Sequence, residues 1–199
     1  MATLTYLKST DTEYTSISTQ FMSGLSHARI HSIIKIDMPS DIANRHETFK
    51  SSQAALRLYH GTKHCCDITK ISDFSKLCQN SGCGVCGIIR YGPRLSNGYV
   101  WFGPCSSISD GYTGARPVGI MDPSIQVLRA IFVMDVVSAT GSHGAYIVPN
   151  GELQYQPAST ESTESTEPIA LTTTTTTATA AILQYYYQLQ QPSTHQHQL

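Results

Sequence analysis

The sequence predicts one α+β domain in which two N-terminal helices are followed mainly by strands joined by loops. Two segments carry this prediction. Residues 10–24 combine the spacing of a capping box with apolar side chains at helical intervals. Residues 128–137 (LRAIFVMDVV) form a nearly continuous apolar run, which is typical of a strand that is buried on both faces. Helical patterns early in the chain and extended patterns later indicate the α+β class.

The N-terminal part begins with two expected helices that are separated by a strand. Thr10 and Glu13 have the spacing of a capping box, so the first helix is expected to begin here and to end near Gly24. Residues 30–36 contain four isoleucines, and β-branched residues of this density predict a strand. The second helix is expected to begin at Ser40, whose hydroxyl can accept a hydrogen bond from a free N–H group of the first turn.

Three further strands are expected after these helices. Residues 55–59 (ALRLY) alternate between small or polar and larger apolar side chains. Residues 128–137 give the strongest strand pattern in the chain. Residues 146–148 (YIV) form another short strand, and the Pro-Asn-Gly sequence that follows it predicts a turn.

Charge and composition exclude several classes of protein. Lys and Arg number 13 and Asp and Glu number 14, so the formal net charge of −1 excludes a nucleic-acid binder driven by bulk positive charge. No apolar run approaches the length of about 20 residues that a membrane-spanning helix needs. The first residues show no basic region followed by an apolar one, as a secretory signal requires. We therefore expect an intracellular protein, nuclear or cytoplasmic, that is neither secreted nor bound to a membrane.

The C-terminal part differs in composition from the rest of the chain. Residues 159–167 read STESTESTE, residues 172–179 read TTTTTTAT, and the end is rich in glutamine and histidine. Apolar residues are too sparse here to offset the entropy lost on ordering the backbone. We predict a folded domain over residues 1–157 and a disordered tail over residues 158–199. The tail is either a solvated segment without a specific role or a polar interaction segment that is open to phosphorylation.

Two segments combine residues that suit the binding of a small polar ligand. At residues 58–62 (LYHGT), a strand ends in His60 and is followed by Gly61. Glycine lets a ligand approach the backbone closely, and an imidazole can hydrogen-bond a sugar hydroxyl. Residues 98–113 join an aromatic strand to a serine-rich turn, in which Ser109 and Tyr112 lie three residues apart and could hold a flat polar ring.

Together with residues 145–155 (AYIVPNGELQY), these segments resemble the catalytic domain of the poly(ADP-ribose) polymerase (PARP) family of ADP-ribosyltransferases, with tankyrase-like and fungal members nearest. The family reads HG[ST] at a strand end, then GxYFxxxxSKSxxY, then E[YF][IV][IV]Y. The three segments keep this order and spacing, and the resemblance covers roughly residues 4–157. It implies a split antiparallel β-sheet that binds NAD in a cleft. It also implies transfer of ADP-ribose from NAD to protein side chains, with release of nicotinamide.

The resemblance assigns roles to four residues by position. His60 would bond a ribose hydroxyl of NAD, and Gly61 would hold the nicotinamide carboxamide with its backbone. Ser109 would add a side-chain hydrogen bond to that carboxamide. Tyr112 would stack on the nicotinamide ring.

Three positions that bear on catalysis depart from the family pattern. Trp101 stands where the family has a tyrosine, Ile108 where it has a lysine, and Ala145 where it has its catalytic glutamate. Ala145 cannot orient a ribose hydroxyl or an acceptor, as a carboxylate does. We therefore expect mono- rather than poly-ADP-ribosylation. The alternative is a catalytically weak or inactive PARP-like module that binds NAD, ADP-ribose or a protein partner.

The cysteines form a separate pattern. Residues 78–86 read C-x4-C-x2-C, and three thiolates with a fourth nitrogen or sulfur ligand make up a closed structural zinc site. The ligands would be Cys78, Cys83 and Cys86, with Cys65, Cys66 or His64 as the fourth. The PARP resemblance does not supply these ligands. The alternatives are free thiols that pack as small apolar side chains, as expected for Cys105, or a small zinc-stabilised interaction domain with an incidental HGT sequence.

Overall fold

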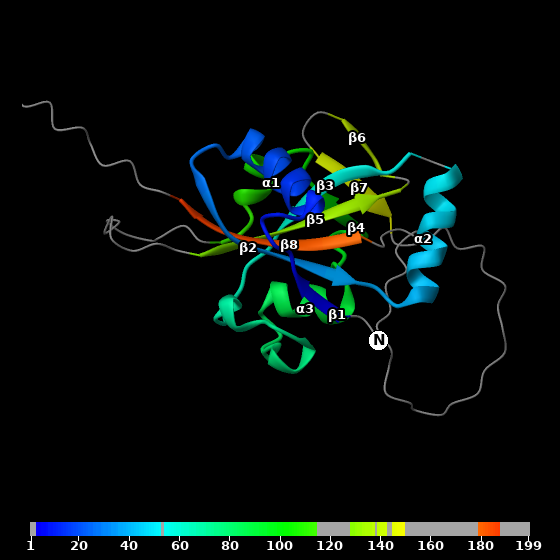
Figure 1. The fold of residues 1–199 in the computed structure, drawn as a ribbon. Coiled ribbons are helices and arrows are strands. Elements are labelled where there is room, and N and C mark those ends of the chain that lie inside the picture. The colour runs from blue at the N-terminus through cyan, green and yellow to red at the C-terminus, as the bar shows by residue number, and fades with distance from the viewer. Residues whose placement is uncertain are drawn as a thin grey trace, which may run out of the picture.

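The computed structural model describes residues 3–52, 54–114, 128–137, 139–142, 145–149 and 179–187. These residues form two antiparallel sheets, and helices pack on both faces of the larger one (Figure 1). The larger sheet has the strand order β1-β2-β8-β5-β3, and the smaller sheet has the order β4-β7-β6. Antiparallel sheets with few helices agree with the α+β class that the sequence predicts.

The strands of the larger sheet are β1 (Thr3–Tyr6), β2 (Ala28–Asp37), β3 (Leu56–Gly61), β5 (Arg129–Val136) and β8 (Thr179–Tyr187). Those of the smaller sheet are β4 (Tyr99–Phe102), β6 (Thr140–Ser142) and β7 (Ala145–Pro149). The helices are α1 (Thr12–Gly24), α2 (Ser40–Ser52), α3 (Gly84–Tyr91) and α4 (Ser106–Asp110), with short 3-10 helices η1 (Ile68–Lys70) and η2 (Phe74–Lys76). None of the helices in the described ranges is long and apolar enough to cross a membrane.

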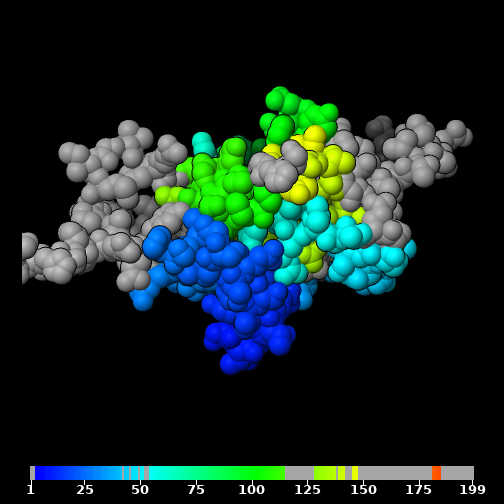
Figure 2. All heavy atoms as spheres, turned by 90° about the horizontal axis from the view of Figure 1, so that it is seen from above, coloured from blue at the N-terminus to red at the C-terminus, as the bar shows by residue number. Residues whose placement is uncertain are grey.

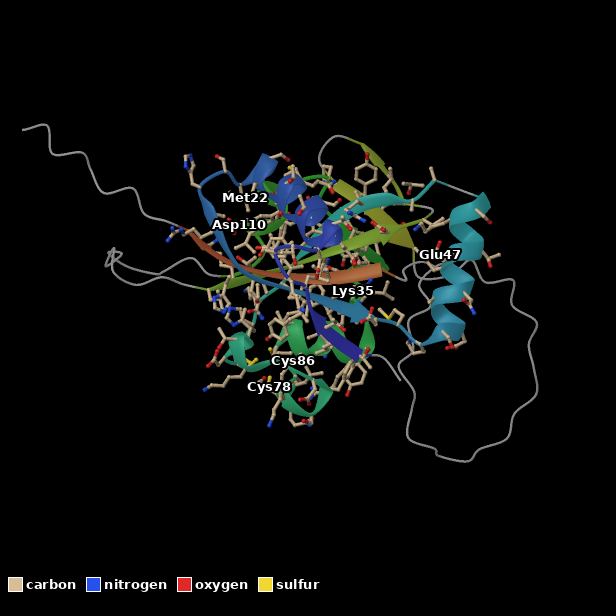
Figure 3. All side chains as sticks on the ribbon, viewed as in Figure 1. Met22, Lys35, Glu47, Cys78, Cys86 and Asp110 are labelled. Atoms are coloured by element: carbon tan, nitrogen blue, oxygen red, sulfur yellow. The ribbon has the colours of Figure 1, made fainter. Side chains whose placement is uncertain are left out.

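Neighbouring residues of the central strands point to opposite faces of the larger sheet, and both faces are buried. The cluster on the α1 face includes Ile17, Phe21, Ile33, Tyr59, Ile131 and Leu183. The cluster on the α3 face includes Ile34, Leu58, Val85, Ile89, Phe132 and Ile182. Figure 3 places the labelled Met22 on the α1 side of the sheet and Cys78 and Cys86 on the α3 side. Burial on both faces explains why the central strands read as continuous apolar runs.

The start of α1 differs from the predicted capping box. The N-cap residue is Asp11, and it makes no side-chain hydrogen bond to the helix. Its carboxylate instead accepts a bond of 2.8 Å from the backbone N–H of Lys8. Glu13 forms an ion pair of 2.9 Å with Lys35 of β2. The helix begins within two residues of the predicted start, but Asp11 takes the place of Thr10 as the N-cap residue, and the Asp11 and Glu13 side chains bond to residues outside the helix.

The middle strand of the larger sheet comes from the segment that was predicted to be a disordered tail. β8 pairs with β2 on one side and with β5 on the other, and residues 181–184 are fully buried. The predicted division at residue 157 is therefore wrong for residues 179–187. The average composition of the tail is polar, but residues 181–183 (AIL) are apolar and gain burial between two strands. The other residues of the predicted tail lie outside the described ranges.

Helix α4 is fixed beside α1 at one end of this sheet. The Ser106 hydroxyl donates a buried hydrogen bond of 2.7 Å to the Phe21 carbonyl of α1. Figure 2 looks down on this side and shows the blue atoms of α1 next to green atoms of the segment that contains α4. At the other end of α4, Asp110 pairs with Arg129 of β5 at 2.8 Å. Both ends of this short helix are thus attached to the core.

Candidate functional site

A pocket of about 370 Å³ opens where β3 ends beside α4. Its described lining comes from the end of β3, the turn before β4, β4 itself, α4 with the turn after it, and the start of β7. The lining residues are His60, Gly61, Ser96, Asn97, Trp101, Phe102, Gly103, Ile108, Ser109, Tyr112 and Ala145. The fold thus brings together the six residues that the sequence singles out for NAD chemistry, namely His60, Gly61, Trp101, Ser109, Tyr112 and Ala145.

Backbone hydrogen bonds at Tyr59 form the floor of this pocket. Tyr59 N–H donates to the Gly103 carbonyl at 2.9 Å, and Gly103 N–H donates back to the Tyr59 carbonyl at 2.7 Å. These two groups of Tyr59 therefore point away from β5, the partner of β3 in the larger sheet. Backbone groups two residues apart on a strand point to the same side, so the N–H and C=O of Gly61 also face away from β5, toward the pocket. They suit a ligand amide, which carries one donor and one acceptor.

Among the described residues, the Ser109 hydroxyl has one polar hydrogen-bond partner. It donates a hydrogen bond of 2.9 Å to the Tyr59 carbonyl, and the residue is only 2% exposed. Its single hydrogen is used in this bond, while its lone pairs remain available. Ser109 can therefore accept a hydrogen bond from a ligand N–H. The NH₂ group of a carboxamide has two such donors, and Ser109 can bind one of them.

The ring of His60 is held in one orientation. Its Nδ1 lies 2.8 Å from the Trp101 carbonyl, and the ring packs edge-on against Phe102 with the centroids 5.9 Å apart. A carbonyl only accepts, so Nδ1 carries the hydrogen and Nε2 of the neutral ring is an acceptor. Burial lowers the pKa of His60, although the bond to Trp101 acts in the opposite direction. The ring is therefore neutral near pH 7 and can accept a hydrogen bond from a ligand hydroxyl.

Gly61 is required by close packing. A Cβ atom at this position would overlap the carbonyl oxygen of Ser109 and would lie 3.3 Å from the Cβ of Tyr112. The absence of a side chain lets β3 and α4 approach each other at the pocket floor. The position therefore links the shape of the pocket to the stability of the fold.

We expect Gly61→Ala to lower the free energy of unfolding by about 1–3 kcal/mol, because a methyl group here must push α4 away from β3. The matched control is Gly111→Ala, where the added Cβ would meet its nearest atom, the Ile108 carbonyl oxygen, at 3.4 Å. This control is expected to change stability by no more than about 0.5 kcal/mol. Urea unfolding followed by circular dichroism measures both. Equal midpoints for the two variants would contradict the packing argument.

Aromatic side chains form the rim of the pocket. Trp101 is 46% exposed and Tyr112 is 69% exposed, so both offer ring surface to a ligand. Trp101 is fixed by its Nε1–H, which donates to the Ser96 carbonyl at 3.1 Å, and by an edge contact with Tyr99 at 6.4 Å. The indole N–H is thus committed to the protein, and Trp101 has only its π-face to contribute.

The pocket lining carries no carboxylate and no permanent cation among the described residues. Ala145, at the start of β7, lines the pocket at the position where the PARP pattern has glutamate. The pocket offers backbone amide groups, one imidazole acceptor, one hydroxyl acceptor and aromatic faces. This set can bind a flat, uncharged amide and a sugar hydroxyl, and among the described lining residues the neutral His60 imidazole is the one group that could accept a proton.

Sequence reasoning missed Ser96 and Asn97, which complete one wall of the pocket. They lie in a tight turn in which Ser96 and Tyr99 exchange backbone hydrogen bonds of 2.7 and 3.2 Å. Asn97 and Gly98 have φ angles of 54° and 81°. Positive φ at both central residues is typical of a type I′ hairpin turn, for which Asn-Gly is the preferred sequence. The Asn-Gly dipeptide at residues 97–98 is therefore the sequence feature from which this turn could have been predicted.

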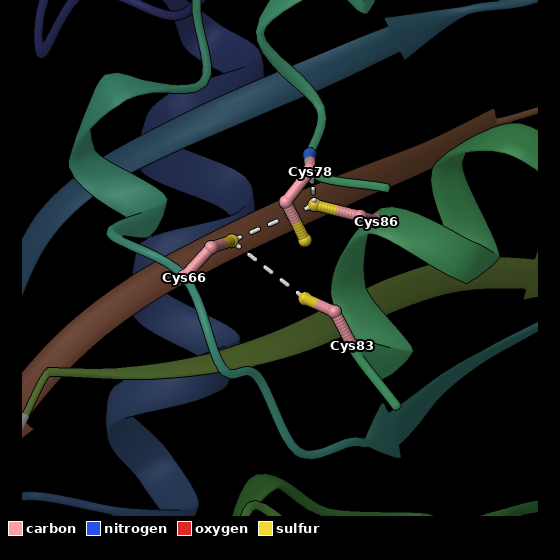
Figure 4. A group of neighbouring side chains, drawn as sticks. All are labelled: Cys66, Cys78, Cys83 and Cys86. Atoms are coloured by element: carbon pink, nitrogen blue, oxygen red, sulfur yellow. Dashed lines mark hydrogen bonds between the residues drawn. The ribbon is translucent and has the colours of Figure 1, made fainter. Parts of the chain in front are cut away.

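Four cysteines form a second candidate site on the α3 side of the sheet (Figure 4). The sulfur atoms of Cys66, Cys78, Cys83 and Cys86 all lie within 4.8 Å of one another. Cys66 Sγ is 3.6 Å from both Cys83 Sγ and Cys86 Sγ. Such a cluster could hold a metal ion such as zinc.

The structure selects Cys66 from the three candidates that the sequence left open for the fourth ligand. The His64 ring instead lies between two backbone carbonyls, with Nδ1 3.1 Å from Cys66 O and Nε2 2.9 Å from Leu128 O. Cys65 is exposed, and Cys105 lies outside the cluster with its sulfur 3.2 Å from the Ser107 hydroxyl. The spacing C-x4-C-x2-C correctly identified the other three cysteines.

Backbone donors favour the thiolate form of one member of the cluster. Burial opposes ionisation of the Cys83 thiol, but the N–H groups of Cys65 and Cys86 donate to its sulfur, and its pKa falls to about 6. Cys78 N–H similarly donates to Cys86 Sγ at 3.3 Å. The pKa of Cys66 is raised, first by burial and then by its thiol neighbours. A bound cation would remove this penalty, since metal ligation requires the deprotonated form.

The chain matches no protein-family model, and it matches none of the curated proteins. Its similarity to the PARP family therefore rests on the three short segments at residues 58–62, 98–113 and 145–155. The pocket that gathers His60, Gly61, Ser109 and Tyr112 is an observation independent of this similarity.

Proposed function

We propose that this chain binds NAD in the pocket between β3 and α4 and transfers single ADP-ribose units to protein side chains, with release of nicotinamide. One observation supports this most strongly: a single cavity gathers the His60 acceptor, the Gly61 backbone, the Ser109 hydroxyl and the Tyr112 ring. The two antiparallel sheets support the split-sheet, ADP-ribosyltransferase-like fold that the sequence resemblance implies.

The groups in the pocket suit the nicotinamide end of NAD. The carboxamide would exchange hydrogen bonds with the N–H and C=O of Gly61, and its second N–H would be accepted by Ser109 Oγ. The Tyr112 and Trp101 rings would offer faces for the pyridine ring. His60 Nε2 would accept a hydrogen bond from a ribose hydroxyl. Each of these contacts positions the ligand and none of them is a reacting group.

The reaction itself would be a substitution at the ribose C1′ carbon. The bond from C1′ to the nicotinamide nitrogen breaks, and nicotinamide leaves with the bonding electrons as a neutral molecule. The cationic centre that develops on the ribose is captured by a nucleophilic side chain of the acceptor protein, whose proton passes to water. Catalysis would come from positioning and from release of the leaving group into a fitted cavity.

The second candidate is a binding module with little or no turnover. It is favoured by Ala145 and by the lack of a carboxylate among the described lining residues. Without a group to orient an incoming ribose hydroxyl, extension of a polymer chain has no support in this pocket. In this case the occupant would be NAD, ADP-ribose or a segment of a partner protein.

We expect His60→Ala to weaken NAD binding about tenfold, because one well-oriented hydrogen bond to a half-buried acceptor contributes about 1.5 kcal/mol. His27→Ala is the matched control, since His27 is exposed in the turn between α1 and β2. Calorimetry with NAD measures binding, and transfer of label from adenine-labelled NAD to protein measures turnover. Binding with single-unit transfer supports the first function, and binding without transfer supports the second. Equal NAD affinity for His60→Ala and the unchanged chain would contradict both.

We also propose that Cys66, Cys78, Cys83 and Cys86 hold one zinc ion. Sulfurs at the corners of a tetrahedron, each about 2.3 Å from zinc, lie about 3.8 Å apart. The distances from Cys66 Sγ to Cys83 Sγ and to Cys86 Sγ, both 3.6 Å, are close to this value. Four sulfur ligands leave no open position, so the ion would be structural and would take no part in the transfer reaction.

Elemental analysis of protein purified under reducing conditions is expected to give one zinc per chain. Cys83→Ser should lose the metal, because a serine hydroxyl is not ionised at neutral pH and is a poor zinc ligand. Cys105→Ser should retain it, because this thiol contacts Ser107 outside the cluster. A zinc content that is the same in both variants would return the four cysteines to the role of buried thiols.

A further inference from the structure

We propose that the metal centre formed by the four cysteines positions the pocket: the ion holds residues 62–66, the segment that leaves Gly61, in the place where a ligand can bind. The occupancy of the metal centre would then control ligand binding in the pocket while the larger sheet stays folded. The part that concerns NAD rests on the proposed function, whereas the part that concerns the segment does not.

The first step is a direct contact between this segment and α3. Val85 N–H, in the first turn of α3, donates to the Lys63 carbonyl at 3.3 Å. Gly84 lies so close to Thr62 that a Cβ on Gly84 would overlap the Thr62 hydroxyl. The start of α3 therefore rests on the two residues that follow Gly61, and a shift of either one moves the other.

The second step is that the same turn of α3 carries two metal ligands. Cys83 is the N-cap residue of α3, and Cys86 lies in its first turn. Cys66, at the far end of the segment, faces both of them at 3.6 Å. A metal ion bound to these sulfurs closes a small ring through residues 62–66 and the start of the helix. Without the ion, the Cys66 sulfur is joined to Cys83 and Cys86 only by thiol contacts, which are weak because a thiol is a weak donor and a weak acceptor.

The third step is that the rest of the cysteine loop is held by contacts that do not need the metal. Arg90 of α3 donates to the carbonyls of Cys78 and Leu77 at 2.6 and 2.7 Å. The buried Gln184 of β8 donates to the Ile68 carbonyl at 2.7 Å. Loss of the metal is therefore expected to release residues 62–66 selectively.

Among the described contacts, residues 62–66 have three attachments besides the metal: Val85 N–H donates to Lys63 O, Cys65 N–H donates to the Cys83 sulfur, and the last is made by the His64 ring. Both of its ring nitrogens face backbone carbonyls, of Cys66 and Leu128. A neutral imidazole has one N–H and can therefore donate only one of these two bonds at a time. Release of the segment would carry Gly61 with it, and the backbone amide groups of Gly61 are the ones that face the pocket.

The test measures amide hydrogen exchange and NAD affinity on the full chain in three states: zinc-loaded, stripped with a chelator, and reloaded with zinc. Stripping is expected to speed the exchange of residues 61–66 at least about tenfold and to leave β5 and β8 protected. If the segment is in place for about a tenth of the time, NAD affinity falls about tenfold. Reloading with zinc is expected to restore both.

Two serine variants separate the metal from the thiols. Cys66→Ser is expected to behave like the stripped chain, even when zinc is supplied. Cys65→Ser, the neighbouring exposed thiol, is expected to behave like the zinc-loaded chain. Faster exchange at residues 61–66 on stripping, in a chain that binds no NAD in any state, would support the positioning role and reject the NAD proposal.

Four results would overturn the inference. The first is a chain that binds no zinc, and the second is exchange at residues 61–66 that does not respond to stripping. The third is an NAD affinity that is the same in the stripped and zinc-loaded chains. The fourth is a simultaneous loss of protection in β5 and β8, because the metal would then hold the whole sheet and not this segment.

Discussion

A chain that ends at residue 178 is expected not to fold. The nine residues of β8 lie between β2 and β5, so their removal leaves both of these strands without a partner on one side. It also removes Ile182 from one apolar cluster and Leu183 from the other. Truncation of one such side chain to alanine costs about 2–5 kcal/mol, against a total stability of about 5–15 kcal/mol for a typical domain.

Circular dichroism and urea titration of three chains test this expectation. The chain that ends at residue 178 should show no cooperative transition, and a chain that ends at residue 187 should unfold at the same urea concentration as the full chain. Ile182→Asp in the full chain should reproduce the loss of structure, because it buries an unpaired carboxylate between strands. Ile182→Val should cost only about 0.5–1.5 kcal/mol. A cooperative transition at an unchanged midpoint for the shortest chain would show that β8 does not hold the sheet together.

Ala145→Glu is expected to raise the rate of nicotinamide release from NAD by about a hundred- to a thousandfold. Ala145 lines the pocket from β7, which is held by pairing with β4, so a side chain added here enters the cavity from a fixed strand. A carboxylate would accept a hydrogen bond from the ribose and stabilise the positive charge that develops there. A charge placed in this way commonly lowers the activation free energy by about 3–4 kcal/mol.

Ala145→Gln is the matched control for this gain. It adds almost the same volume and can form hydrogen bonds, but it carries no charge, so the rate should rise far less than with glutamate. NAD affinity should change little in either variant, because the contacts of His60, Gly61 and Tyr112 remain. Nicotinamide release measured by chromatography gives the rates. Equal rates for the two variants would show that position 145 does not correspond to the catalytic glutamate of the family.

Much of the larger sheet could be predicted because local patterns and burial agree. The isoleucines of residues 30–36 and the apolar run of residues 128–137 lie in strands that are covered on both faces, so hydrophobicity alone identifies them. The strand β8 could not be predicted in the same way. Its apolar core of four residues lies between threonine and tyrosine-glutamine tracts, and its burial depends on partners that are distant in sequence.

Some residues of the candidate sites could likewise be predicted from local sequence, and others could not. His60, Gly61, Ser109 and Tyr112 could be singled out because their residue types suit a polar ligand and their order and spacing resemble the PARP motifs, and the structure places all four around one pocket. The choice of Cys66 over Cys65 and His64 could not be made, because the three are consecutive and only the path of the backbone decides which side chain faces α3. The contact between Gly84 and Thr62 could not be predicted either, because it joins two residues that are distant in sequence and depends on the path of the backbone.

The place of β8 in the sheet has a consequence for the biosynthesis of this protein. A ribosome makes β2 and β5 well before residues 179–187, and at about 5–20 residues per second the delay after β5 lasts several seconds. During that time, each strand presents a free edge of unpaired N–H and C=O groups, which is the surface through which nascent chains associate wrongly. Translation that stops early yields a product that cannot close its sheet. The newly made chain is therefore expected to depend on chaperones until β8 has emerged from the ribosome and paired with β2 and β5.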